Sequence, residues 1–232
     1  MPRSTVRKPN PSLDLSPYLY VLRDRELPEH VEVRLTGQDF PPPPETVTSQ
    51  TLFGNDHPLE VEIGSGKGLF LTTESQRRPN HNYLGIEIVG KYARHSAARL
   101  AKAGRDNAKM VSGNGESLLA NRVPESSLEA VHVYFPDPWW KKRHRKRRVV
   151  NESSVRDFSK AVRTGGRLHF WTDVLDYFEA TIEMIADVAP EFGVPMPEAV
   201  RESAHDLDYH THFERRSRQN EIPVYRVCYA RR

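Results

Sequence analysis

Short apolar segments that alternate with helical stretches constrain the fold of this chain more than any other feature. From Leu59 onward, strands are predicted at 59–63, 83–87, 108–111, 129–135 and 167–172, with a last strand inside 222–232. Helical periodicity is present at 68–77, 91–102, 153–162 and 174–188. The alternation is typical of an α/β fold in which crossover helices cover both faces of a mostly parallel sheet. Tyr83, Phe170, Trp171 and Cys228 lie inside these strands and are expected in the core.

The first 58 residues differ from the rest because they are rich in proline. They hold ten of the 18 prolines, four of them in succession at 41–44. Proline runs favour extended or irregular backbone, so we expect this segment to wrap the domain and its first dozen residues to be disordered. We therefore divide the chain into an N-terminal extension at 1–50 and one domain at 51–232.

The positive charge of the chain is concentrated in one segment. Lysine and arginine total 34 against 31 acidic residues, and seven of the basic residues lie within 141–148, where there is no acid. The remaining chain has 27 basic and 31 acidic residues, a formal charge of −4, although the whole chain has +3. One basic patch on a mildly acidic body indicates a polyanionic partner, and nucleic acid is the obvious candidate.

Composition argues against several classes of protein. A single cysteine cannot form an intramolecular disulfide, and no Cys/His spacing typical of zinc sites occurs. The mean hydropathy is −0.67, and no apolar run approaches the roughly 18 residues that a membrane span requires. We therefore expect a soluble, cytoplasmic protein without a signal peptide. His205, His210 and His212 match no metal motif, so no metal site is predicted.

Three acidic residues interrupt the apolar pattern where predicted strands end. Glu62, Glu87 and Asp137 lie near the carboxyl ends of three strands, although strands of a parallel sheet are covered on both faces and are normally apolar. In open α/β sheets the ligand crevice lies outside these strand ends. Solvent exposure explains any one of these acids equally well, but three together indicate a ligand site.

A glycine-rich turn follows the first of these acids. Its sequence, GSGKG at 64–68, lets the backbone approach a ligand closely before a helix begins. The spacing is neither GxGxxG nor a Walker A loop, and it suits a nucleoside with an amino-acid tail better than a pyrophosphate. Glu87 occupies the position from which an acid binds ribose hydroxyls. Asn114 either pairs with an adenine edge or is an ordinary turn residue.

These segments, together with the basic block and the strand that precedes it, resemble one known family. The matching segments are FGNDHPLEVEIGSGKG (53–68), GIEI (85–88), VYFPDPWWKKRHRKRR (133–148), TD (172–173) and THFERR (211–216). They resemble the bacterial tRNA (guanine-N7)-methyltransferases, which use S-adenosylmethionine (SAM) as methyl donor. The resemblance implies a Rossmann-like class I methyltransferase fold with a seven-stranded, mostly parallel sheet. It also implies methyl transfer to N7 of a guanine in the tRNA variable loop, at position 46.

The resemblance further assigns roles to residues of this chain. The residues implied to bind SAM are Glu62, Gly64, Gly66, Gly68, Glu87, Asn114 and Asp137. Those implied to contact the target guanosine are Lys141, Asp173, Thr211, Phe213 and Glu214. Those implied to contact the rest of the tRNA are Arg143, His144, Arg145, Lys146, Arg147 and Arg148. The chain departs from the family at Ser217 and Glu221, where relatives often carry glycine.

The chemistry of the reaction narrows what these side chains must do. Guanine N7 is an unprotonated lone pair at neutral pH, so the transfer needs no general base and positioning dominates. Asp137, the expected catalytic residue, faces a purine that gains positive charge. We hypothesise that at least one of Asp137, Asp173 and Glu214 accepts the N1–H and N2–H groups of guanine and so selects it over adenine. Trp139 or Trp140 either stacks on a base or covers the sheet as a hydrophobic lid.

Other functions remain possible at this level. A methyltransferase that acts on another RNA position or on a protein would share the donor site. A non-catalytic RNA-binding protein would keep the basic block but would not need the acids at the strand ends. A nicotinamide-dependent dehydrogenase is disfavoured by the glycine spacing. The segments FPDPWWK and THFE favour the tRNA enzyme over a methyltransferase with another target, and Glu62, the glycine loop and Asp137 argue against a non-catalytic protein.

The basic block predicts strongly salt-dependent binding to tRNA. If about four to six of its side chains contact phosphates, the logarithm of the association constant should fall with the logarithm of salt concentration with a slope of about −3 to −5. Filter binding or fluorescence anisotropy over a salt series measures this slope. A flat response would contradict the prediction.

Overall fold

The computed structural model describes residues 10, 12–23, 40–139, 142–198 and 209–232, except for the side chains of Lys142, Arg145 and Lys146. Along the chain, its strands are β1 (Leu19–Val21), β2 (Leu59–Ile63), β3 (Asn82–Glu87), β4 (Ala108–Ser112), β5 (Leu128–Tyr134), β6 (Val162–Thr172), β7 (Met196–Pro197) and β8 (Tyr225–Ala230). Its α-helices are α1 (Ser49–Phe53), α2 (Leu69–Arg77), α3 (Gly90–Ala103), α4 (Gly115–Arg122), α5 (Glu152–Ala161), α6 (Leu175–Val188) and α7 (His212–Gln219). Two short 3₁₀ helices, η1 (Lys142–Arg147) and η2 (Pro190–Phe192), complete the described elements.

All the strands belong to one sheet with the order β1-β4-β3-β2-β5-β6-β8-β7. The pairs from β1 to β6 are parallel, and β8 is antiparallel to both β6 and β7. From β2 the chain first builds outward through β3 and β4, and it then returns to place β5 on the other side of β2. The order therefore reverses between β2 and β5, which is where open α/β sheets bind their ligands.

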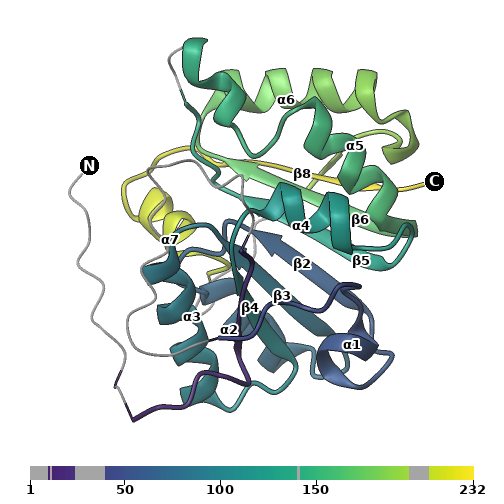
Figure 1. Cartoon of the computed structure of the whole chain (residues 1–232). Helices are drawn as coiled ribbons and strands as arrows, with labels where there is room; N and C mark the ends of the chain where they lie inside the picture. The colour runs from purple at the N-terminus through teal and green to yellow at the C-terminus, as the bar shows by residue number, and fades with distance from the viewer. Residues whose placement is uncertain (1–9, 11, 24–39, 140–141, 199–208) are drawn as a thin grey trace.

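Helices cover both faces of the sheet (Figure 1). One core cluster contains apolar residues of α4, α5 and α6 together with alternate residues of β2, β3, β5 and β6. A second cluster contains Phe70 and Leu71 of α2 and Ala97 and Leu100 of α3. Successive residues of a strand point to opposite faces of the sheet, so neighbouring residues of one strand generally belong to different clusters.

The face toward α2 carries an unusual number of polar residues. Glu60 of β2 accepts a hydrogen bond from Nε2 of His132 on β5 at 2.8 Å, and Nδ1 of His132 lies 2.8 Å from the hydroxyl of Tyr134. Burial alone would raise the pKa of Glu60, but His132, Arg78 and His81 together lower it to about 2. Buried polar groups of this kind are stable only when they are paired. On this face β2 and β5 therefore combine paired polar groups with the second apolar cluster.

The predicted α/β architecture is confirmed, with three differences in detail. Each predicted strand and helix is present with ends shifted by a few residues, but the sheet has eight strands where seven were expected. Two strands were not placed from the sequence: β1, which comes from the proline-rich segment and pairs with β4, and β7, which pairs with β8. Helices α1, α4 and α7 were not predicted. The buried positions of Tyr83, Phe170, Trp171 and Cys228 agree with the expected core.

The described part of the N-terminal segment packs into the domain. Leu22 follows β1 and donates its backbone N–H to the carbonyl of Ser112 at 3.0 Å, and its side chain belongs to the core cluster of α4 to α6. Arg122 of α4 donates to the carbonyl of Pro43 at 2.9 Å. Most of the first dozen residues, which were expected to be disordered, lie outside the described ranges. No helix within those ranges has the length and apolar character that spanning a bilayer requires.

Replacing Leu22 should destabilise the whole domain. The side chain is 2% exposed, so Leu22→Ala leaves a cavity and should lower the free energy of unfolding by about 2 to 5 kcal/mol. Urea denaturation followed by circular dichroism measures the change as one cooperative transition. Glu45→Ala, an exposed residue of the same segment, is the control and should change the value by less than about 0.5 kcal/mol. An unchanged midpoint for Leu22→Ala would mean that the segment is not part of the core.

Candidate active site

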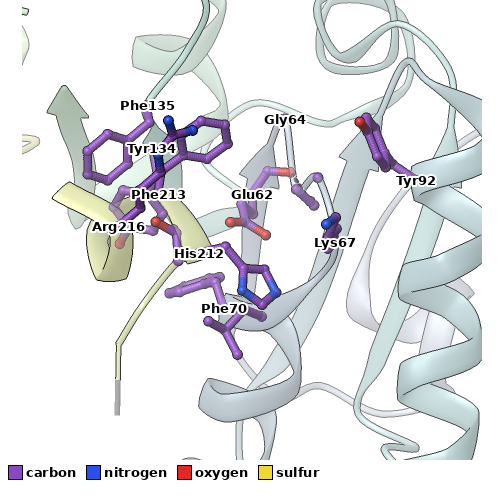
Figure 2. Close-up of a pocket in the computed structure, with 14 residues that line it drawn as sticks. Glu62, Gly64, Lys67, Phe70, Tyr92, Tyr134, Phe135, His212, Phe213 and Arg216 are labelled. Carbon is purple, nitrogen blue, oxygen red and sulfur yellow. Dashed lines mark hydrogen bonds between the residues drawn. The ribbon is translucent and has the colours of Figure 1, made fainter. Parts of the chain in front are cut away.

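A cavity of about 260 Å³ lies outside the carboxyl ends of β2 and β5, at the point where the strand order reverses. It joins four stretches of the chain: the glycine loop with the start of α2, the first turn of α3, the end of β5, and the start of α7 (Figure 2). The lining residues are Glu62, Gly64, Ser65, Gly66, Lys67, Leu69, Phe70, Tyr92, Tyr134, Phe135, Thr211, His212, Phe213 and Arg216.

The glycine loop needs glycine for its backbone conformation. Gly64, Gly66 and Gly68 have φ values of 81°, 52° and 68°, in the left-handed region that other residues rarely adopt. A Cβ added to Gly64 would have no atom within 4 Å, whereas one added to Gly68 would lie 2.8 Å from Cβ of Ser96. Gly68 therefore permits close packing of the loop on α3, and Gly64 leaves space at the cavity.

The carboxylate of Glu87 ties this loop to the end of β3. Its Oε2 accepts from the backbone N–H of Gly66 at 2.8 Å, and its Oε1 accepts from the backbone N–H of Val89 at 2.8 Å. Burial raises the pKa of Glu87, the two N–H donors oppose that effect, and the charge of Asp137 adds to it. Glu87 thus holds the loop at the end of β3.

Glu62 is the acid with unused hydrogen-bonding capacity. Its side chain lines the cavity and is 3% exposed, and its Oε2 has no hydrogen-bond partner among the described residues. Burial raises the pKa of Glu62 to about 8, with the nearby Ser65 opposing the shift and Glu87 adding to it. A buried acceptor without a partner is unfavourable unless a ligand supplies a donor.

Asn114 supports a helix end near the same edge of the sheet. It is the N-cap of α4, where its Oδ1 accepts from the backbone N–H of Glu116 at 2.9 Å. This is the ordinary role of asparagine at a helix start, and it leaves the amide nitrogen able to donate. Asn114, Glu87 and Asp137 do not appear among the residues that line the cavity.

The turn after β5 has a strained backbone. Phe135 and Trp139 have φ values of 50° and 42°, which are uncommon for residues other than glycine. The N–H of Phe135 donates to the carbonyl of Trp171 at 2.8 Å, and Arg148 donates from Nε to the carbonyl of Pro138 at 2.8 Å. These contacts at both ends hold the turn, and they leave the side chain of Asp137 exposed.

The basic block forms the 3₁₀ helix η1, which returns to the turn. Trp139 is half-buried, with the ring of His144 stacked at 5.8 Å and the guanidinium of Arg147 at 5.3 Å from its ring centre. Arg143 and Arg147 are exposed. Arg148 instead lies 4.2 Å from the ring centre of Tyr177, so its side chain braces the turn. Trp140 and Lys141, and the side chains of Arg145 and Lys146, lie outside what the structure describes.

Helix α7 carries the THFE segment to the cavity. Thr211 is its N-cap and accepts from the backbone N–H of Glu214 at 3.0 Å. Glu214 is 1% exposed, and its two carboxylate oxygens contact the backbone N–H of His210 at 2.8 Å and the guanidinium of Arg226 at 3.3 Å. Among the residues expected to bind guanosine, Thr211 and Phe213 line the cavity. The expectation that Glu214 offers a free carboxylate needs correction, because its oxygens are used to fix α7.

Asp173, the remaining candidate for guanosine binding, is exposed directly after β6. It lies outside the lining of the cavity. Its position one residue beyond the end of the strand is comparable to that of Asp137, three residues beyond the end of β5. These two exposed carboxylates are therefore on adjacent strands at the same edge of the sheet.

Several cavity residues were not singled out from the sequence. Lys67, His212 and Arg216 lie inside segments that carried the family resemblance. The segments were recognised, but these three residues were not predicted to line a ligand cavity. Phe70 and Tyr92 lie on helices and look like ordinary apolar residues, which gave no signal. Burial lowers the pKa of His212, and together with the charges of Arg99 and Lys67 it brings the pKa to about 4. The imidazole at the cavity is therefore neutral at pH 7.

The described residues contain no group of three or more His, Cys, Asp or Glu side chains placed to hold a metal ion. His205 lies outside those residues. His210 packs against Trp171, with ring centres 4.8 Å apart, and burial lowers its pKa to about 4. His210 and His212 thus contact different partners.

Comparison with known proteins gives consistent results along the chain. The family model described as "Putative methyltransferase" matches residues 56–227. A tRNA (guanine-N(7)-)-methyltransferase of Rhodopirellula baltica is 60% identical over 237 aligned positions, which cover 100% of this chain and 81% of that protein. One from Streptococcus mutans is 33% identical, covering 77% of this chain and 83% of that protein. The structure of the 16S rRNA methyltransferase KamB shares the fold, with a TM-score of 0.58 and 14% identity over 78% of this chain and 91% of that one.

The raised pKa of Glu62 predicts a pH-dependent stability. Since the carboxyl has a pKa of about 8 in the folded protein and 4.5 as its ordinary value, the folded protein keeps a proton that the unfolded chain releases. The free energy of unfolding of the ligand-free protein should therefore fall as pH rises from 4.5 to 8. Glu62→Gln removes this contribution and should be more stable than the wild type at pH 8, by a few kcal/mol at most.

Urea denaturation of both proteins across this pH window tests the prediction, with the exposed Glu45→Gln as control. Parallel pH profiles for the wild type and Glu62→Gln would contradict a neutral, buried Glu62.

Proposed function

The chain belongs to the tRNA (guanine-N(7)-)-methyltransferase family, and from that membership we infer that it transfers the methyl group of SAM to N7 of a guanine in tRNA. We further propose that the target guanine lies in the variable loop, at position 46. The observation that carries the proposal is the cavity, because its lining brings together the glycine loop, the end of β5 and the THFE segment. The substrate class would place the protein in the bacterial cytoplasm, where tRNA is made.

The residues around the glycine loop fit SAM. The buried Oε2 of Glu62 accepts no hydrogen bond from any described residue, which suits the ammonium or the hydroxyl groups of such a ligand. The left-handed glycines let the loop lie close to the cavity, and Glu87 holds its shape by accepting from the backbone N–H of Gly66. Asn114, beyond β4, and Asp137, beyond β5, lie past the carboxyl ends of their strands and are the proposed contacts for the adenosine part. When bound, SAM supplies a methyl group on positively charged sulfur, and its transfer to N7 moves the positive charge to the purine without release of a proton.

The chain must hold the purine in line with that methyl group. Tyr134, Phe135 and Phe213 supply apolar walls that exclude water beside the loop. Excluding water and fixing the orientation lowers the barrier by an amount on the order of 7 to 11 kcal/mol in well-positioned reactions. Asp137 is the proposed catalytic residue, since a carboxylate near the purine favours the form that carries positive charge.

Guanine selection falls to two carboxylates in this proposal. Glu214 is committed to α7, so the acceptors left for the N1–H and N2–H groups of guanine are Asp137 and Asp173. Both are exposed and lie beyond adjacent strands. Adenine lacks this donor pair, so a carboxylate that accepts it would discriminate between the two bases.

The tRNA backbone would be held by the basic block. Arg143 and Arg147 are exposed on η1 and are the described side chains best placed for phosphates, since the guanidinium fork suits phosphate oxygens. Arg148 contributes indirectly by bracing the turn that carries Asp137. The substrate backbone and the reacting base are thus held by residues within a dozen positions of each other.

Labelled methyl transfer to tRNA transcripts tests the proposed function. The enzyme should label an unmodified transcript and leave unlabelled a matched transcript that carries adenine in place of the variable-loop guanine. Borohydride and aniline treatment should then cleave the labelled chain at that position, as expected for an N7-methylated guanine. Equal labelling of both transcripts would move the target elsewhere, and labelling of neither would contradict the proposal.

A further inference from the structure

Two aromatic rings lie close together at the edge of the cavity. Phe135, just beyond β5, and Phe213, in the first turn of α7, have nearly parallel ring planes at 19°, with ring centres 6.1 Å apart. Figure 2 shows both side chains together at one end of the cavity, away from Lys67 and Tyr92. They come from segments that are 78 positions apart in the sequence.

The two rings differ in how firmly they are held. Phe135 is partly buried against the core cluster of α2 and α3, and its backbone is anchored to Trp171 in the left-handed conformation. Phe213 has 52% of its surface exposed, although the helix that carries it is fixed through Thr211 and Glu214. One ring is thus a fixed wall, and the other is a side chain that can change rotamer on a fixed backbone.

The strain at Phe135 is informative. A positive φ at a bulky residue costs about 1 to 3 kcal/mol and persists mainly where function requires it. Here the strain turns the chain at the end of β5 so that the ring of Phe135 lines the cavity while Asp137 remains at the strand end. A relaxed strand continuing through Phe135 would follow the alternation of β5 instead.

We propose that Phe135 and Phe213 form an aromatic clamp that takes the target guanine between their rings. This rests on the proposed function, since it specifies how that substrate base is held. A base in van der Waals contact on both faces needs about 7 Å between the rings, twice the carbon contact distance. The ring centres are 6.1 Å apart, and a change of rotamer at the half-exposed Phe213 opens the space between the rings to the base.

The clamp suits the charge that the reaction creates. N7 forms its bond to the methyl carbon as the carbon–sulfur bond of the donor breaks, the bonding electrons stay on sulfur, and the purine becomes a cation. The faces of aromatic rings carry negative partial charge and attract cations. Two phenyl faces therefore hold the methylated base more tightly than guanine, which favours the transition state over the bound substrate.

Trp139 does not compete for this role among the described aromatic residues. It contacts His144 and Arg147 and is absent from the cavity lining. The clamp also explains why a large apolar side chain is exposed at the start of a helix whose other exposed residues are polar.

Substitutions at the exposed Phe213 test the clamp without disturbing the core. Phe213→Leu keeps the apolar character but removes the stacking face, and it should lower kcat/KM for tRNA by about fivefold to 150-fold, the range for losing one stacked base contact. Phe213→Tyr should keep kcat/KM within about threefold of the wild type, because it restores a ring. Ile222→Ala, which removes a side chain with 41% exposure outside the cavity lining, is the matched control and should have no effect.

The same variants distinguish a clamp from a lid over the donor. The Kd for SAM, measured by isothermal titration calorimetry, should be unchanged in Phe213→Leu. A parallel loss of SAM affinity, or wild-type kcat/KM in Phe213→Leu, would overturn the clamp. If the wild type labels the guanine transcript and Phe213→Leu does so equally well, the clamp fails while the proposed function stands.

Nucleotide affinities test the clamp even if the proposed function is wrong. With the wild type, 7-methylguanosine monophosphate should bind more tightly than guanosine monophosphate, by about threefold or more. Phe213→Leu should lose this preference, and Phe213→Tyr should retain it. Equal affinities for the two nucleotides in the wild type would overturn the clamp.

Discussion

The carboxylate of Glu87 is the interaction on which the cavity depends. It is buried at the end of β3 and accepts from Gly66 on one side and Val89 on the other. Three left-handed glycines give the neighbouring loop its shape, but glycine gains most conformational freedom on unfolding and does not hold a shape by itself. The carboxylate supplies the missing restraint. Because it is occupied in this way, Glu62 is the acid left to receive a ligand.

The polar face of the sheet extends this arrangement to the opposite wall of the cavity. Tyr134 lines the cavity, and its hydroxyl lies against His132, which is paired with Glu60. Burial lowers the pKa of His132 despite the carboxylate beside it, so the imidazole is neutral at pH 7. Nε2 then carries the proton given to Glu60, and Nδ1 accepts from Tyr134. A fixed tautomer in the core thus fixes the orientation of a side chain at the surface of the cavity.

The regular strands and helices could be predicted because the periodic spacing of apolar residues shows which side chains are buried. The strands from β2 to β6 and the helices α2, α3, α5 and α6 follow the apolar pattern, and Glu62 was identified because it breaks that pattern. Strand β1 has three residues, and its pairing with β4 joins segments some 90 positions apart, which local periodicity does not report. Helix α7 is rich in arginine and has little apolar pattern, but Thr211 and Glu214 have the spacing of a helix N-terminus. That signal was present, and it would have assigned Glu214 to the helix end.

The aromatic clamp was not visible in the sequence because it joins segments that are far apart along the chain. Asp137 and the basic block are neighbours along the chain, so a single stretch revealed both the reacting centre and the grip on the backbone. Phe135 and Phe213 become neighbours only because β5 ends beside β2 at the reversal of strand order and α7 is fixed over that edge. One ring is held by a strained turn and the other by a capped helix. A base that enters between them is therefore placed by two elements whose positions are set independently of the glycine loop, which allows donor and acceptor to be aligned by separate parts of the fold.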